Sequence, residues 1–346
     1  MLRTTPLALS VLAAVSMACA TGAESEPGGE PVEAAEPHDP ITVVVAPFLG
    51  HAPIVIAAES GAFEREGLDV EVEELRSPRD ALPLLVQGEI DVWAGTTSPA
   101  LFRVLGTEDD VSIVAARGHI AATGCDYKTT VIREDIASED GWDRPDRLTE
   151  LEFAGTTRNI ADRYYVDRVA SHLGVDRDDI TLVDLDRGAL VGALESGRVH
   201  GAILAEPWVT QVMDAVPSEV WMPAGEVMPG FELGLLAYGP RLLRDEPELG
   251  ERFMAGYLAA LEQYREGPTE ENVDLLEGSL GLDRDVIERA CWPTVHDDAL
   301  IDPEALLEQQ RFVVAENLLD EEYPIERLWD PTFVENAAEH RSGDDS

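Results

Sequence analysis

Hydroxyl-bearing side chains gather in two short turns, GTTSP at 95–99 and GTTRN at 155–159. Hydroxyl groups donate hydrogen bonds to anionic or carbonyl oxygens, and a guanidinium can pair with a carboxylate or sulfonate through two hydrogen bonds. The side chains concerned are those of Thr96, Thr97, Ser98, Thr156, Thr157 and Arg158. Helix capping by the hydroxyls and a solvent-facing charge at Arg158 are the alternatives. We expect ligand contacts from both turns, because both follow predicted strands that should face each other.

Aromatic and ionisable side chains follow other apolar segments. Glu206 and Trp208 end a very apolar run, where a carboxylate and an indole could hold a polar ring or an amine; core packing is the alternative for Trp208. Phe48 and His51 follow the first apolar run and could line the opposite wall, although a lone histidine is more often structural. Phe231 precedes a later apolar run and is a further candidate.

No pattern for metal binding or catalysis accompanies these residues. The seven histidines are scattered without ligand spacing, and Lys128 is the only lysine. No nucleophile stands beside a base in the motifs. We therefore expect no metal, no cofactor and no chemistry on the bound molecule.

Strand and helix signals alternate from about Ile41 onward. ITVVVAPF is typical of a buried strand, APIVIAAESG of a short helix, and IDVWAG of the strand before the first hydroxyl-rich turn. Such alternation favours an α/β fold with parallel-type sheets flanked by helices. In these sheets, ligands bind beyond the carboxyl ends of the strands, near helix N-termini. The candidate residues fall at those places.

Two segments of the chain, 81–99 and 190–208, resemble each other. Gly88 aligns with Gly197 and Ile90 with Val199, and each segment combines a helix, a glycine stop and a buried strand. This likeness indicates two lobes that share one cleft. We expect the first lobe to comprise 41–120 and 236–334 and the second lobe 121–235, with crossing segments near 117–129 and 231–240.

Both ends of the chain have a different character. Residues 1–19 combine Arg3, an apolar stretch and Cys19, which predicts a signal peptide with lipid attached to the cysteine. Ser16 departs from the usual lipidation pattern, so ordinary cleavage is the alternative. Residues 20–40 are rich in Glu, Pro and Gly and predict a disordered tether, and 335–346 predict a disordered tail. No later segment is apolar enough to cross a membrane.

The charge balance is strongly acidic. Sixty-nine acidic residues against 25 basic ones give a net charge of −44. Such a field repels polyphosphates, which excludes nucleic acid as a partner. Cys125 and Cys291 form a candidate disulfide in an oxidising compartment, and two buried free thiols are the alternative.

The order of these segments resembles one family, the type II periplasmic substrate-binding proteins of ABC importers for nitrate, sulfonates, taurine and thiamine-pyrimidine precursors. The resemblance rests on APIVIAAESGAFEREGLDVEVEEL, ALPLLVQGEIDVWAGTTSPAL and ALESGRVHGAILAEPWV. It implies a two-lobed fold with a hinge cleft that closes on a small-molecule solute. It also implies an extracytoplasmic, lipid-anchored monomer that delivers the solute to the transmembrane subunits of an ABC permease.

Relatives with the same fold include enzymes, namely pyrimidine synthases with a lysine-bound cofactor and menaquinone-pathway lyases. Lys128 is the sole candidate for a Schiff base, and an exported protein lacks a cytosolic supply of cofactor, which argues against the first class. The leader opposes the second class. An extracytoplasmic ligand sensor is the third alternative, and nothing in the sequence separates sensing from import.

Overall fold

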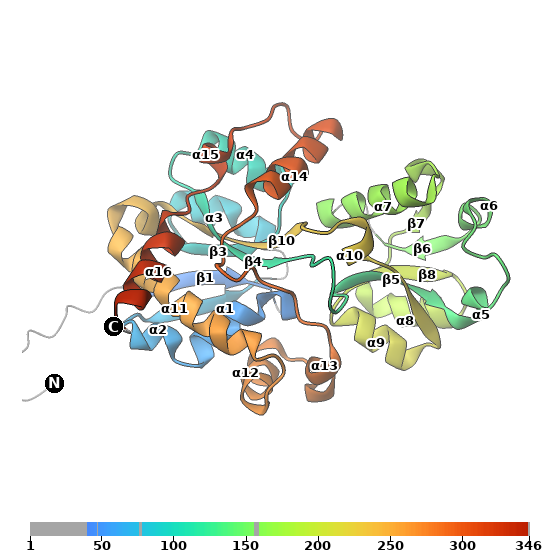
Figure 1. Ribbon diagram of the computed structural model, residues 1–346, viewed down its shortest axis with the longest axis horizontal. Coiled ribbons are helices and arrows are strands. Elements are labelled where there is room, and N and C mark those ends of the chain that lie inside the picture. The colour runs from blue at the N-terminus through green and yellow to red at the C-terminus, as the bar shows by residue number, and fades with distance from the viewer. Residues whose placement is uncertain (1–39, 47, 76–77, 156–158, 345–346) are drawn as a thin grey trace, which may run out of the picture. The chain divides into compact units, whose positions relative to one another are not determined.

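Two mixed sheets organise the residues that this computed structural model describes, which are 40–46, 48–75, 78–155 and 159–344. The first sheet has five strands in the order β2-β1-β3-β10-β4 (Figure 1). β1 pairs in parallel with β2 and β3, whereas β10 runs antiparallel to β3 and β4. Its strands are β1 Ile41–Val45, β2 Val70–Glu74, β3 Val92–Gly95, β4 Ser112–His119 and β10 Glu232–Tyr238.

The second sheet repeats this plan with the order β7-β6-β8-β5-β9. β6 pairs in parallel with β7 and β8, and β5 runs antiparallel to β8 and β9. Its strands are β5 Lys128–Arg133, β6 Glu152–Ala154, β7 Thr181–Val183, β8 Gly201–Ala205 and β9 Ser218–Pro223. We call each sheet with its helices a lobe, first and second in this order.

The internal sequence likeness corresponds to equivalent places in the two sheets. Gly88 follows α3 (Leu82–Gln87) with a φ of 71°, and Gly197 comes two residues after α8 (Arg187–Glu195) with a φ of 72°. Glycine adopts this left-handed conformation without a steric penalty. Each glycine is followed by the third strand of its sheet, β3 or β8.

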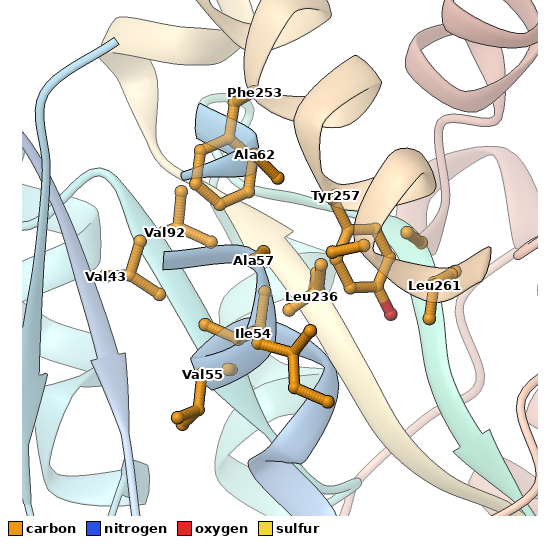
Figure 2. Packing of buried hydrophobic residues seen from close by; sticks show 14 of the residues in the cluster. Val43, Ile54, Val55, Ala57, Ala62, Val92, Leu236, Phe253, Tyr257 and Leu261 are labelled. Carbon is orange, nitrogen blue, oxygen red and sulfur yellow. The ribbon is translucent and has the colours of Figure 1, made fainter. Parts of the chain in front are cut away.

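Helices cover both faces of the first sheet (Figure 1). Because side chains alternate along a strand, Val43 packs with α1 and α11 on one face, and Val44 packs with α3 and α4 on the other. On the α11 face, Phe253 and Tyr257 lie over the sheet together with Ile54 of α1 (Figure 2). The helices of this lobe are α1 Ala52–Glu59, α2 Ala62–Arg65, α3, α4 Pro99–Thr107, α11 Pro247–Arg265, α12 Glu270–Leu280, α13 Arg284–Arg289, α14 Pro303–Ala315, α15 Ile325–Leu328 and α16 Thr332–Asp344.

The second lobe is also covered on both faces. Tyr165 and Val169 of α7 pack with Ile203 on one side, and Leu194 and Val212 of α8 and α9 lie on the other. Burying each such side chain contributes about 1.5–3 kcal/mol. Its helices are α5 Glu134–Ala137, α6 Pro145–Leu148, α7 Ile160–Leu173, α8, α9 Trp208–Ala215 and α10 Ala224–Val227.

The chain passes between the lobes twice. It leaves the first sheet after β4 and enters the second at β5, and it returns between α10 and β10. The return comes before the expected boundary at 236, because β10 begins at Glu232, which pairs with His119 of β4. Residues 232–235 therefore belong to the first sheet and not to the second lobe.

The prediction of a disordered tail at 335–346 is wrong for most of its length, since α16 extends to Asp344. Phe333, Val334 and Ala337 are buried on the first lobe. Asn336 Nδ2 also donates to Glu251 Oε1 at 2.9 Å. The apolar side chains at the start of the helix anchor it, and the polar composition of the last turns conceals this from sequence inspection.

A disulfide joins the first crossing segment to the segment after α13. The sulfur atoms of Cys125 and Cys291 are 1.98 Å apart, and their Cα atoms are 5.5 Å apart.

Within the described residues, no helix combines the length and the apolar character that a membrane span requires.

Candidate ligand-binding site

A cavity of about 530 Å³ lies between the two sheets and is lined by residues of both lobes. The first lobe contributes the residues that follow β1 and β3, together with the end of β4. The second lobe contributes the start of β5, the start of α7 and the end of β8. The volume falls in the range of about 300–1,000 Å³ that is usual for small-molecule sites.

The first hydroxyl-rich turn lines this cavity. Thr96, Thr97 and Ser98 stand between β3 and the start of α4. Ser98 Oγ accepts a hydrogen bond from Leu101 N at 3.1 Å and so caps the helix. Thr97 is only 3% exposed, and its Oγ1 has no hydrogen-bond partner among the described residues. Capping therefore accounts for Ser98 and not for Thr97.

The second hydroxyl-rich turn lies outside the described residues, since these exclude Thr156, Thr157 and Arg158. Its two neighbours, Gly155 and Asn159, line the cavity. Asn159 Oδ1 accepts a hydrogen bond from Ala161 N at 2.8 Å and caps α7.

The residues after β1 also line the cavity. His51 is fully buried, and its Nε2 lies 3.1 Å from Ala94 O. Burial, followed by the charge of Arg117, holds the pKa of His51 well below its usual value. The imidazole is therefore neutral at pH 7, and we assign the ring proton to Nε2, which donates to the carbonyl. Nδ1 is then an acceptor, and it has no partner in the described part of the chain.

Two aromatic side chains from opposite lobes meet at the cavity. Phe48 of the first lobe and Trp208 at the start of α9 both line it, with ring centroids 6.1 Å apart. Phe48 also packs edge-on against His51 at 4.6 Å. These rings give the cavity an apolar wall to which both lobes contribute.

The structure does not bring the other two candidates into the cavity. The carboxylate of Glu206 accepts hydrogen bonds from Thr210 Oγ1 at 2.9 Å and from Cys291 N at 3.2 Å. It therefore holds the first turn of α9 to the segment after α13. Phe231, which stands in the second crossing segment, is buried against the ring of Tyr164, with centroids 5.0 Å apart.

Sequence inspection missed Arg117, which lines the cavity at the end of β4. Its side chain is only 2% exposed, and Nη2 donates to Gly95 O at 3.1 Å. Burial lowers the pKa of Arg117 to about 10, so the guanidinium is charged at pH 7. A single basic residue ending the apolar run VSIVAAR was the available signal.

Lys128, which the sequence analysis considered only as a Schiff-base candidate, is a second charged residue that was not predicted to line the cavity. It lines the cavity at the start of β5, is 3% exposed and forms an ion pair with Asp162 of α7. Its ammonium also lies 5.4 Å from the centre of the Tyr165 ring. Because the positive charge of Lys128 is paired with Asp162 within the second lobe, the two side chains together add no net charge to the wall of the cavity.

A protein-family model described as NMT1-like matches residues 34–220, which is more than half of the chain. The chain belongs to the NMT1-like family. A sequence search of curated proteins finds no match to this NMT1-like chain.

Solved structures share the fold of this NMT1-like protein. The zinc-bound ligand-binding component of an ABC-type import system from Staphylococcus aureus is 14% identical, with a TM-score of 0.69; the match covers 87% of this chain and 99% of that one. The periplasmic aliphatic sulphonate-binding protein SsuA from Escherichia coli is 15% identical, with a TM-score of 0.69, and the match covers 85% and 93%. Both have the type II binding-protein fold that the sequence predicted.

An enzyme has the same fold. The desulfurization enzyme DSZB is 15% identical to this NMT1-like chain, with a TM-score of 0.59, and the match covers 88% of this chain and 100% of the enzyme. The fold thus serves both solute binding and catalysis, so the function has to be inferred from the side chains in the cavity.

Proposed function

We propose that this protein is the extracytoplasmic solute-binding component of an ABC importer. The observation that carries the proposal is the cavity of about 530 Å³ lined by both lobes, beside which the chain crosses twice. Lobes connected in this way can rotate about the crossings, so a solute that contacts both lobes favours the closed state. The family and the import proteins among the structural neighbours support this function.

Ion pairs join the two lobes beside the cavity, and such contacts are weak enough to break when the lobes separate. Glu316 accepts hydrogen bonds from Arg163 and Arg177, both at 2.7 Å, which joins α14 of the first lobe to α7 and the loop after it. On the other flank, Arg289 pairs with Asp214 of α9 at 2.6 Å. Ion pairs that solvent reaches in this way contribute little net stability, because water and salt screen them. They can therefore guide closure without preventing reopening.

Holding a solute, and not transforming it, fits the side chains of the cavity. Among the described lining residues, Thr97 has no hydrogen-bonded base, and Lys128 is paired with Asp162. Cys125 and Cys291 are consumed in the disulfide. The nucleophile and base that covalent catalysis requires are thus not arranged together in this part of the chain.

The proposed function includes export and anchoring at the membrane. A signal peptide over 1–19, a lipid on Cys19 and a tether over 20–40 would hold a monomer outside the cytoplasm, next to its permease. Replacing Cys19 with Ala should release the protein into the soluble fraction. Unchanged membrane retention in a fractionation assay would contradict the lipid anchor while leaving solute binding intact.

Thermal unfolding in the presence of candidate solutes tests the binding function. Sulfonates, nitrate, bicarbonate, pyrimidines and aromatic acids form the first panel, together with a metabolite extract. A solute that binds only the folded protein raises the midpoint temperature, and small-angle scattering should then show a more compact particle. Mass spectrometry of the recovered solute is the control for chemistry. Recovery of an altered molecule would overturn the proposal in favour of an enzyme.

A further inference from the structure

Residues 290–294, which follow α13, form a short segment that we call the strap. The ring of Trp292 in the strap stacks on that of Tyr264 of α11, with centroids 5.3 Å apart. At its far end, Thr294 O accepts a hydrogen bond of 2.8 Å from His119 N, the last residue of β4. Both contacts are made with elements of the first lobe. The strap is therefore mounted on the first lobe and moves with it.

The last part of the first crossing segment moves with the second lobe instead. Glu206 N, directly after β8, donates to Tyr127 O at 2.9 Å. Closer to the first lobe, a Cβ at Gly225 of α10 would lie 2.6 Å from Ala121 O, so α10 packs tightly on the crossing segment there. Cys125 stands between these two contacts, and it therefore follows the second lobe.

The two crossing segments are bonded to each other between these parts. Ile120 N donates to Phe231 O at 2.9 Å, and Gly230 N donates to Ile120 O at 2.7 Å. At this pair of hydrogen bonds the chain passes between the lobes in both directions, so the pair marks the axis about which the lobes rotate. Cys125 lies on the second-lobe side of this axis, whereas Cys291 belongs to the strap on the first-lobe side.

The disulfide between Cys125 and Cys291 is therefore a third covalent connection between the lobes, and it lies away from the axis. A motion that carries the start of α9 away from the strap has to pull on this bond. A disulfide keeps the Cα atoms of its cysteines within about 7 Å of each other. The bend at 122–124 before Cys125 is exposed and ends in a glycine, so it allows some movement. The bond thus limits rotation without preventing it.

Weaker contacts hold the strap and α13 against the second lobe, where α13 lies beside α9 (Figure 1). Cys291 N donates to Glu206 Oε1 at 3.2 Å. Arg289 of α13 donates two hydrogen bonds to the carboxylate of Asp214, at 2.7 Å and 2.6 Å. These contacts are made only while α9 lies against the strap. Once they break, the disulfide decides how far α9 can move away.

We propose that the Cys125–Cys291 disulfide is an opening stop, which limits how far the lobes separate, and that its reduction by a dithiol removes this limit. A limited range keeps open arrangements close to the closed one, so closure around a solute costs less free energy. The inference goes beyond the proposed function, because it concerns the range of motion and not the solute.

Energy transfer between two dyes, one on each lobe and without any solute, tests the opening stop. Exposed positions for the dyes are Glu195 of α8 and Glu248 of α11, labelled through non-natural side chains so that the cysteines stay unmodified. In the double variant Cys125→Ser with Cys291→Ser, the longest populated separations should increase by about 5 Å or more, because the limit of about 7 Å between the two Cα atoms is gone.

Reduction of the unaltered protein provides a second measurement on a chain that folded with the bond in place. Cys125 is exposed, so dithiothreitol reaches the bond in the folded protein. The two thiols of the reagent become a cyclic disulfide, and the two cysteines become thiols. Alkylation with iodoacetamide then keeps the cysteines apart. The dye separations should lengthen as in the double serine variant, and removal of the reagent without alkylation should restore the original distribution.

Phe333→Ala is the control for a general loss of stability. It removes a buried ring that packs on Tyr238 at the far end of β10 and leaves the crossing segments unaltered, so the dye separations should not change. Equal separations with and without the disulfide would overturn the proposal, as would a shift in Phe333→Ala as large as in the double serine variant. If the serine variant and the reduced protein both unfold, the bond is a requirement for folding, and the proposal is also wrong. None of these outcomes affects the proposed function, which the thermal unfolding panel tests separately.

Discussion

A cluster of titratable side chains stands where both crossing segments leave the first sheet. The rings of His119 and His296 stack at 3.8 Å with an interplanar angle of 6°. His296 Nε2 lies 2.8 Å from Glu232 Oε1, and Glu232 is fully buried at the start of β10. The hydrogen bond to Glu232 raises the pKa of His296, whereas burial and the neighbouring His296 lower the pKa of His119 to about 4.

The sign of the His119 shift predicts a pH effect on stability. In the unfolded chain, His119 titrates near its ordinary value of 6.5, so the unfolded state binds more protons between pH 6.5 and about 4. The contribution of His119 to stability is therefore complete above pH 6.5 and is lost as the pH falls through this window. Between pH 7 and pH 4.5, the unfolding temperature of the unaltered protein should fall more than that of His119→Gln.

Scanning calorimetry at several pH values makes this comparison. His172→Gln, at an exposed position of α7, is the control and should follow the unaltered protein. If the unfolding temperatures of His119→Gln and of the unaltered protein fall equally between pH 7 and pH 4.5, the lowered pKa of His119 is contradicted.

Sequence patterns located several residues that line the cavity but missed two charged ones, Arg117 and Lys128. Phe48, His51 and the turn 96–98 were found because they follow buried strands, where parallel sheets expose helix starts. Arg117 and Lys128 were missed because their roles depend on which charges lie opposite them in the fold. That information is tertiary, and neither strand pattern nor spacing contains it.

At the scale of the elements, each sheet has parallel strand pairs on one side and antiparallel pairs on the other. The apolar pattern of a buried strand is the same in parallel and antiparallel pairing, so the sequence predicted parallel-type sheets. β5 and β10 are antiparallel to their neighbours because each enters its sheet from the other lobe. Direction follows from the path of the chain between the lobes and not from local composition.

The anchoring of α16 gives a prediction for stability. The ring of Phe333 packs edge-on against Tyr238 with centroids 5.0 Å apart, and its side chain is 5% exposed. Phe333→Ala should lower the free energy of unfolding by about 3–5 kcal/mol, because it removes contacts and leaves a cavity. Urea titration measures the change, with the exposed Glu339→Ala as control. A loss below about 1 kcal/mol would indicate that the helix is frayed, as its composition suggests.

At the scale of the whole molecule, Glu316 connects the lobes beside the cavity. Burial alone would raise the pKa of Glu316, but hydrogen bonds from Arg177 and Arg163 outweigh it and lower the pKa. The carboxylate side chain is 13% exposed, so both pairs are partly shielded from solvent. These contacts favour whichever arrangement of the lobes brings α14 and α7 together.

Glu316→Gln should therefore shift the population toward more open arrangements. We expect solute affinity to fall about two- to fivefold, which is the worth of partly exposed ion pairs. Small-angle scattering should show a larger particle without solute. Glu321→Gln, at an exposed position after α14, is the control. Equal affinity and equal size for Glu316→Gln and the unaltered protein would show that these pairs do not stabilise closure.

The place of β10 has a consequence for the order in which a newly made chain can fold. β10 lies between β3 and β4, although the whole second lobe separates it from β4 in the sequence. A chain that emerges N-terminus first therefore cannot complete its first sheet until Tyr238 has appeared, whereas all strands of the second sheet are present once Pro223 is out. A chain truncated after Val227 should therefore be protected from protease in 128–223 but not in 41–119, and protection of 41–119 would contradict this order. The lobe synthesised first is thus the lobe finished last.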